Sequence, residues 1–152
     1  MKHQLFEEIE KFRNWSVRLS QTPEEERTGK WEGAYDRWNA IDAAFVNFIS
    51  TSEPGDWSEK MTEALLYIIA RDHGSEVFAD LVAAHPDKLL YLTWQAVDAK
   101  SPASRWQLAV RLTELADPAL AESLLLRFID DPDECVRQRS AQTLAAIRLG
   151  HS

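Results

Sequence analysis

The sequence of 152 residues has little of what several protein classes require. It contains one cysteine, Cys135, which excludes an internal disulfide and favours a reducing compartment. No apolar run approaches the roughly 20 residues that a membrane-spanning helix needs. The acidic, amphipathic N-terminus MKHQLFEEIEKF lacks the basic start and unbroken apolar stretch of a signal peptide. We therefore expect a cytoplasmic protein with no membrane partner.

Basic residues are also scarce, since 17 Lys and Arg stand against 25 Asp and Glu, for a net charge of −8. Proteins that bind nucleic acids cluster Lys and Arg to neutralise phosphates, and no such cluster occurs in this chain. Direct nucleic-acid binding is therefore not expected. An acidic surface favours basic partners through electrostatic steering, although the charge could equally serve solubility alone.

Prolines are few, yet three of them fall at one fixed interval. Pro54, Pro86 and Pro118 are evenly spaced (86 − 54 = 118 − 86 = 32), and Pro23 precedes them at almost the same spacing (54 − 23 = 31). A period of about 30 to 45 residues on a helical pattern is typical of a solenoid of stacked helical hairpins. Other residues recur at the same interval as the prolines, and these pairs are Leu92/Leu124, Ala96/Phe128, Val97/Ile129, Asp98/Asp130, Arg105/Arg137, Leu108/Ser140, Ala109/Ala141 and Leu112/Leu144.

Helix starts are marked by capping residues, and no segment alternates as a strand would. The expected caps before a proline are Thr22-Pro23, Ser101-Pro102, Asp117-Pro118 and Asp131-Pro132, and the expected capping boxes are Thr22/Glu25, Asp56/Glu59 and Asp131/Glu134. Apolar periodicity predicts helices over 3–20, 31–50, 57–72, 75–85, 87–99, 103–116, 118–130 and 133–149. A single helical turn from Pro23 is expected in the polar connection over 20–30.

The last unit, Leu124 to Ile147, reads LLLRFIDDPDECVRQRSAQTLAAI and resembles a HEAT repeat. That family combines an apolar first helix, a turn with Asp, and the pattern Val-Arg-x-x-Ala-x-x-x-Leu; the matching positions are Asp131, Val136, Arg137, Ser140, Ala141 and Leu144. The preceding unit, Leu89 to Leu115, matches more weakly, with Ser104 where Val is usual but Arg105 kept. The resemblance is confined to these two C-terminal units, and its spacing is closest to the short HEAT-like units of bilin-lyase relatives. It implies a polar ladder between neighbouring repeats, involving Arg105, Asp131 and Arg137.

We therefore expect an all-α fold, an α-solenoid of about four antiparallel helical hairpins in a right-handed superhelix, of the HEAT or armadillo kind. It forms one domain over 1–152, with divergent units over 1–56 and clearer repeats over 57–152. The first two units lack the HEAT motif and hold acidic and aromatic residues instead.

Few residues are candidates for chemistry. His73 and Glu76 are spaced like a metal or proton-sharing pair, but Gly74 as C-cap and Ser75 as N-cap explain the segment as a plain turn between helices. Cys135 lies at an expected helix start without a histidine to act as base. We therefore expect no catalytic residue, no metal site and no cofactor. Of the tryptophans, Trp38, Trp57 and Trp94 fall on apolar helix stripes and are expected in the core.

The most distinctive polar segment is acidic and aromatic. Trp31 and Tyr35 are flanked in sequence by acidic residues. We expect such a segment to recognise a basic protein, because the aromatic rings supply contact area while the carboxylates bind Lys or Arg. The predicted partner-binding residues are Glu24, Glu25, Glu26, Trp31, Glu32, Tyr35 and Asp36. The alternative is an N-terminal cap in which Trp31 and Tyr35 pack on the first hairpin.

The sequence thus predicts a non-enzymatic protein-binding module. By analogy of fold and charge, one concrete example is a bacterial inhibitor or immunity protein that covers the active site of a basic toxin. Such a protein is expected to be a monomer alone and a heterodimer with its partner. Two alternatives stay open: a HEAT-like enzyme or small-ligand binder of the bilin-lyase kind, and a scaffold subunit.

Overall fold

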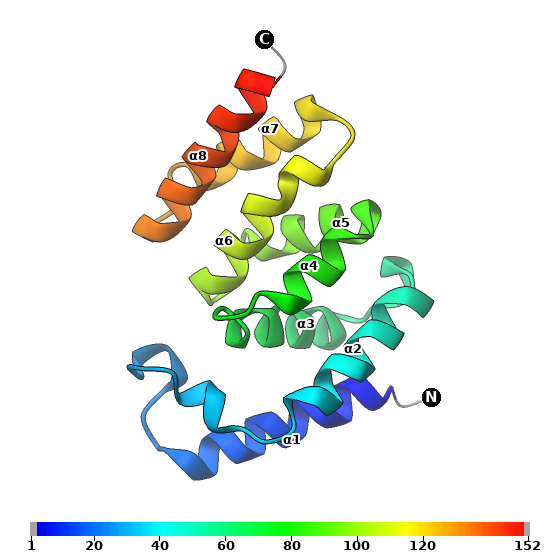
Figure 1. Cartoon of the computed structure of the whole chain (residues 1–152), viewed down its shortest axis with the longest axis vertical. Coiled ribbons are helices and arrows are strands. Elements are labelled where there is room, and N and C mark those ends of the chain that lie inside the picture. Colours follow the sequence, from blue (N-terminus) through cyan, green and yellow to red (C-terminus); the bar gives the residue numbers. More distant parts are fainter. Residues whose placement is uncertain (1–2, 151–152) are drawn as a thin grey trace. The chain divides into compact units, whose positions relative to one another are not determined.

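A computed structural model describes residues 3–150, and within that range the chain is all-helical without a strand, as expected. Figure 1 shows the elements in chain order. The α-helices are α1 (Gln4–Leu19), α2 (Trp38–Thr51), α3 (Glu59–Arg71), α4 (Val77–Ala83), α5 (Pro86–Ala96), α6 (Pro102–Val110), α7 (Pro118–Phe128) and α8 (Glu134–Gly150). Short 3-10 segments are η1 (Glu24–Glu26), η2 (Trp31–Ala34), η3 (Pro54–Asp56) and η4 (Arg111–Glu114). None of the helices within 3–150 is both long and apolar enough to cross a membrane.

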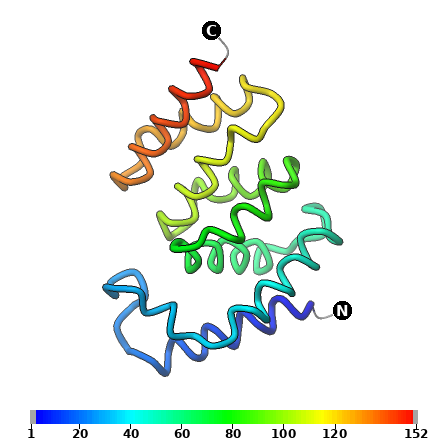
Figure 2. The backbone as a smooth tube through the Cα atoms, in the orientation of Figure 1, coloured from blue at the N-terminus to red at the C-terminus, as the bar shows by residue number. Residues whose placement is uncertain are grey.

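The chain divides into two compact units, Met1–Asp56 and Trp57–Ser152. The division falls at the residue where the acidic and aromatic sequence gives way to the clearer repeats. In the first unit, α1 and α2 run antiparallel, and the chain reverses between them through residues 20–37 (Figure 2). Apolar side chains at helical spacing meet between the two helices; those most deeply buried are Leu5, Ile9, Phe12, Ile41, Phe45, Phe48 and Ile49.

In the second unit, α3, α6 and α8 form a row in which each packs on the next. Helices α5 and α7 each pack on the helix that follows them, α6 and α8, to form two antiparallel hairpins (Figure 1). The expected hairpin of 57–72 with 75–85 is irregular, because α4 has only seven residues and packs mainly on α5 and η4. The core of the last two hairpins is formed by Ala109, Leu112, Ala121, Leu124, Leu125, Phe128, Val136, Leu144 and Ile147.

The regular prolines begin helical elements. Pro54, Pro86 and Pro118 are the first residues of η3, α5 and α7, where a missing N–H removes no helical hydrogen bond. Pro23 stands at the N-cap of η1, so the single turn expected there is present. The expected cap at Asp117 is confirmed, since its carboxylate accepts hydrogen bonds from the amides of Ala119 (3.0 Å) and Leu120 (3.3 Å).

Other expected boundaries and caps were wrong by a few residues. Helix α3 is capped by the Ser58 hydroxyl, which accepts from the Met61 amide at 3.2 Å, rather than by Asp56. Helix α8 begins at Glu134 and is capped by Asp133, whose carboxylate accepts from the Val136 amide at 3.0 Å. Ser101 provides no side-chain cap for α6, and Thr22 provides none for η1, so the capping box expected at 22 is absent. The box expected at 131 is absent because Asp133 caps α8 instead. The expected helix over 31–50 begins only at residue 38, and that over 103–116 tightens into η4 after residue 110.

Candidate partner-binding segment and contacts between hairpins

Residues 20–37, here called the strap, join α1 to α2 and contain every predicted partner-binding residue. Arg27 anchors the strap to the C-terminus of α1. Its guanidinium donates to the carbonyls of Thr22 (2.7 Å), Ser16 (3.2 Å) and Ser20 (3.0 Å), and to the Ser16 hydroxyl (2.9 Å). The Ser16 carbonyl also accepts from the Ser20 amide at 3.3 Å, so Arg27 adds a second donor at the end of α1 and ties the carbonyls of Ser20 and Thr22, just beyond the helix, to it.

Aromatic rings hold the strap along the side of α1. The Arg27 guanidinium lies 4.4 Å from the centroid of the Trp31 ring, and the Trp15 ring stacks on the Trp31 ring with centroids 6.2 Å apart and an interplanar angle of 20°. Tyr35 is buried, with its ring 5.0 Å from that of Phe12 in an edge-on contact. Burial, reinforced by the charge of Glu8, raises the pKa of Tyr35. Trp31 and Tyr35 thus pack on the first hairpin, as the cap alternative described.

The acidic residues of the strap divide into two groups. Glu32 is buried beside the aromatic rings, and its carbonyl accepts from the Trp38 indole at 2.9 Å; Glu24 accepts from the Ser16 hydroxyl. Glu32 and Tyr35 therefore do not face solvent, which corrects their placement among the partner-binding residues. Three predicted residues stay at the exposed surface of the strap, namely Glu25, Glu26 and Asp36, and Trp31 is half-buried.

An ion triad around the buried Glu8 supports the end of the strap. Glu8 of α1 accepts from Lys11 at 2.9 Å and from two nitrogens of Arg37 at 3.0 to 3.3 Å. The hydrogen bond from Lys11 lowers the pKa of Glu8, and Arg37 adds to this, while burial opposes both. This ion triad was not predicted from the sequence. The spacing of Glu8 and Lys11 is that of an ion pair within a helix, but no nearby residue in the sequence indicates that Arg37 joins them.

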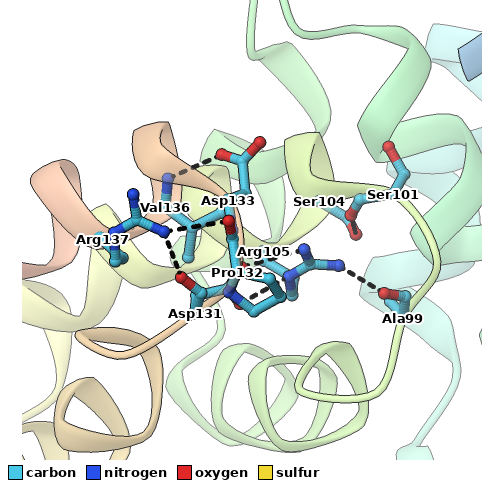
Figure 3. Close-up of polar contacts among 9 residues, drawn as sticks. All are labelled: Ala99, Ser101, Ser104, Arg105, Asp131, Pro132, Asp133, Val136 and Arg137. Carbon is cyan, nitrogen blue, oxygen red and sulfur yellow. Dashed lines mark hydrogen bonds and ion pairs between the residues drawn. The ribbon is translucent and has the colours of Figure 1, made fainter. Parts of the chain in front are cut away.

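The resemblance to HEAT repeats placed Arg105, Asp131 and Arg137 in a polar ladder, and Figure 3 shows how they lie. Arg105 donates to both carboxylate oxygens of Asp131, at 2.8 and 3.1 Å. It also donates to the carbonyl of Ala99 at 2.5 Å, and Arg137 donates to the carbonyl of Asp131 at 2.8 Å. Each arginine therefore reaches the carbonyl six residues before it, and the second contact repeats the first at the proline interval (137 − 105 = 32).

Ser104 stands where a HEAT repeat usually has Val, and the structure shows how a hydroxyl fits there. The side chain is fully buried, and its hydroxyl donates to the carbonyl of Ser101 at 3.0 Å (Figure 3). A buried hydroxyl needs such a partner, because leaving it unpaired costs about 1–3 kcal/mol.

Two cation–π contacts connect the last two hairpins. Arg127 of α7 lies over the ring of Trp94 of α5 at 4.8 Å, and Arg139 of α8 lies over Trp106 of α6 at 4.1 Å. The two pairs have the same separation in sequence (127 − 94 = 139 − 106 = 33). The expectation that Trp94 lies in the core was wrong, since 36% of it is exposed, whereas Trp57 is buried as expected.

The segment around His73 is a turn between α3 and α4, as expected, but other residues form its ends. Asp72 is the C-cap of α3, and its carboxylate accepts from the Phe78 amide at 3.1 Å. Glu76 precedes α4 in a left-handed conformation (φ 56°), and its carboxylate accepts from Arg111 at 3.0 Å. Across residues 3–150, no group of three or more His, Cys, Asp or Glu side chains is placed to hold a metal ion.

No protein-family model, no curated protein and no solved structure matches this chain.

Proposed function

We propose that this chain is a non-enzymatic protein-binding module whose strap engages a basic protein. The observation that carries this proposal is the division of the strap into an inner and an outer side. Arg27 and the aromatic rings fix the inner side on α1, while Glu25, Glu26 and Asp36 remain exposed on the outer side.

A segment held in this way suits recognition. Binding by a mobile loop loses affinity to the entropy of ordering it, and a strap already anchored at several points avoids most of that cost. Carboxylates on the outer side provide acceptors for Lys or Arg, and charge-assisted hydrogen bonds of this kind are about twice as strong as neutral ones. The half-buried Trp31 adds a rigid apolar edge beside them.

The scaffold that we propose is a HEAT-like solenoid, ultimately a right-handed superhelix of hairpins. Its support lies in the second unit, where α3, α6 and α8 form a row and Arg105 and Arg137 repeat the same carbonyl contact. Repeat proteins of this type bury a continuous core between neighbours and leave long surfaces for partners.

A narrower form of the proposal is an inhibitor or immunity protein that covers the active site of a basic toxin. The net charge of −8 supports it, because opposite charge accelerates encounter with such a partner. In this form the chain is a monomer alone and a heterodimer with its partner. A cytoplasmic setting remains a prediction from the single cysteine.

The test is direct titration of the chain with basic proteins encoded beside its gene, by calorimetry at about 50 and about 300 mM NaCl. We expect a one-to-one complex that the higher salt weakens. The double variant Glu26→Lys/Asp36→Lys should weaken it at least about tenfold, because two attractive contacts become repulsive. The control Asp87→Lys/Glu114→Lys changes the net charge equally at exposed positions of the second unit and should have a smaller effect. If no basic neighbour binds at the lower salt, the proposal fails.

A further inference from the structure

Helices α5 and α7 each expose a large apolar side chain that is followed four residues later by an aspartate, and the two pairs are separated by the interval of the prolines. On α5, Trp94 is 36% exposed, and on α7 its counterpart Leu126 is 46% exposed. Asp98 and Asp130 follow four residues after each of them and are also exposed. Within residues 3–150, neither carboxylate has a hydrogen bond or an ion pair. Two neighbouring helices thus present the same unpaired chemistry in register.

The backbone places each pair on one face. Both helices end just before these carboxylates, but Val97 (φ −51°, ψ −39°) and Ile129 (φ −68°, ψ −17°) keep the right-handed helical conformation. The chain therefore follows the helical path up to Asp98 and Asp130. Residues four apart on such a path lie above one another, so each carboxylate flanks its apolar side chain by one turn.

Neighbouring contacts fix the face without covering it. Arg127 of α7 lies over the Trp94 ring of α5 at 4.8 Å and so restrains the indole. The core does not require these exposed side chains, since Leu92 and Leu124, two positions earlier on each helix, are fully buried. Single exposed apolar residues are ordinary, but a tryptophan and a leucine repeated beside two unpaired carboxylates form a patch with a definite pattern.

We propose that this face of α5 and α7 binds an amphipathic helix of a protein partner that carries Lys or Arg beside its apolar stripe. The inference rests on the proposed function only in that the partner is a basic protein. The binding face on α5 and α7 contains no residue of the strap. Arg127 of α7 reaches over the Trp94 ring of α5, so the two exposed apolar side chains lie on adjacent helices, and residues seven apart on a bound helix share one face two turns apart. The bound helix therefore presents two apolar side chains seven residues apart to Trp94 and Leu126. Its basic side chains meet Asp98 and Asp130.

The probe is a labelled helical peptide of about 18 residues with two leucines seven apart and a lysine four residues after each. A matched peptide carries glutamate in place of those lysines. Binding is followed by fluorescence anisotropy at about 50 and about 300 mM NaCl with the full chain. We expect the basic peptide to bind, more weakly at the higher salt, and the acidic peptide not to bind.

Two double variants locate the site on the chain. Trp94→Ala/Leu126→Ala and Asp98→Lys/Asp130→Lys should each weaken peptide binding at least about tenfold. Neither should unfold the chain, because all four side chains are exposed and a lysine near a helix C-terminus is favourable. Circular dichroism checks this.

Several results would overturn the proposal: no binding of the basic peptide below about 1 mM, or equal binding by the wild-type chain and Asp98→Lys/Asp130→Lys. Loss of peptide binding in Glu26→Lys/Asp36→Lys alone would also overturn it, because the peptide would then occupy the strap. Self-association that Trp94→Ala/Leu126→Ala abolishes would overturn it too, since a second copy would then be the occupant. Peptide binding at this face, with no basic neighbour bound by the strap, would uphold the inference while the proposed function failed.

Discussion

Arg105 and Asp131 form a two-bond ion pair that joins α6 to the turn between α7 and α8, with side chains only 10% and 7% exposed. The same carboxylate accepts from the amide of Asp133 at 2.9 Å and so also shapes the turn itself. One side chain thereby couples the contact between hairpins to the geometry at the start of α8. This double engagement explains why α8 is capped by Asp133, since Asp131 is already occupied (Figure 3).

Removing Asp131 should therefore be strongly destabilising. The variant Asp131→Ala leaves the Arg105 guanidinium buried without its carboxylate, which typically costs about 3–5 kcal/mol. Urea unfolding followed by circular dichroism measures the change in the free energy of unfolding. The control is Glu122→Ala, which removes the exposed pair with Arg148 and should cost no more than about 1 kcal/mol. Equal losses in the two variants would show that Asp131 contributes no more than a surface pair.

Arg27 should be essential for the order of the strap. Replacement by Ala removes two hydrogen bonds to Ser16 of α1, two to the carbonyls of Ser20 and Thr22 in the strap, and the contact with Trp31, and we expect a loss of about 2 kcal/mol in the first unit. Lysine at this position keeps the charge but cannot reproduce the planar fork, so Arg27→Lys should resemble Arg27→Ala. Hydrogen exchange over residues 16–35 should rise while the second unit stays unchanged. Arg18→Ala, which loses one exposed hydrogen bond, is the control.

The helices could be predicted from the sequence because their signals are local: apolar periodicity, prolines at helix starts and capping residues. The exact helix starts could not be predicted, because two residues compete for each N-cap: Asp56 with Ser58 for α3, and Asp131 with Asp133 for α8. For α8, the contact of Asp131 with Arg105 leaves Asp133 as the cap. Local propensity cannot anticipate such a contact from another helix.

The degree of burial of individual side chains also could not be predicted from the sequence. Periodicity shows which face of α5 Trp94 shares with apolar residues, but not that 36% of this side chain stays exposed beside Arg127. The acidic frame of the strap suggested that Tyr35 and Glu32 face a partner. Both are buried, and Tyr35 packs on Phe12, which lies on α1, well before the strap in the chain, and becomes a neighbour only through the hairpin.

At position 76, glycine should give a more stable protein than alanine, the reverse of the usual order within helices. The left-handed backbone of Glu76 (φ 56°) is strained for any residue with a Cβ, by about 1 kcal/mol or more. Glu76→Ala and Glu76→Gly both lose the ion pair with Arg111, but only glycine relieves the strain. Glu76→Gly should therefore be more stable than Glu76→Ala by about 1 kcal/mol in urea unfolding. An alanine variant as stable as the glycine variant would show that the turn relaxes.

Acid should destabilise the first unit through Glu8. The pKa of Glu8 is lower in the folded chain than its ordinary value of 4.5, because Lys11 and Arg37 favour the carboxylate. Its contribution to the free energy of unfolding is therefore complete above the unfolded pKa and is lost as the pH falls through the folded pKa. Hydrogen exchange or unfolding measured between about pH 7 and pH 3 should show this loss. Glu8→Gln should be less stable at neutral pH and lose less on acidification; an unchanged pH profile would exclude Glu8 as its source.

The two cation–π contacts between the last hairpins should contribute similarly to stability. Double-mutant cycles on Trp94 with Arg127, and on Trp106 with Arg139, separate each pairwise term from the packing that a single truncation removes. With guanidinium-to-ring distances of 4.8 and 4.1 Å at partly exposed sites, we expect coupling energies of about 0.5–1 kcal/mol, favourable in both. Similar values would show that neighbouring hairpins are joined by equivalent contacts on both of their helices. A coupling energy near zero in either cycle would mean that the cation–π contact of that pair does not help to hold the two helices together. The arginine of that pair would then be available to a partner.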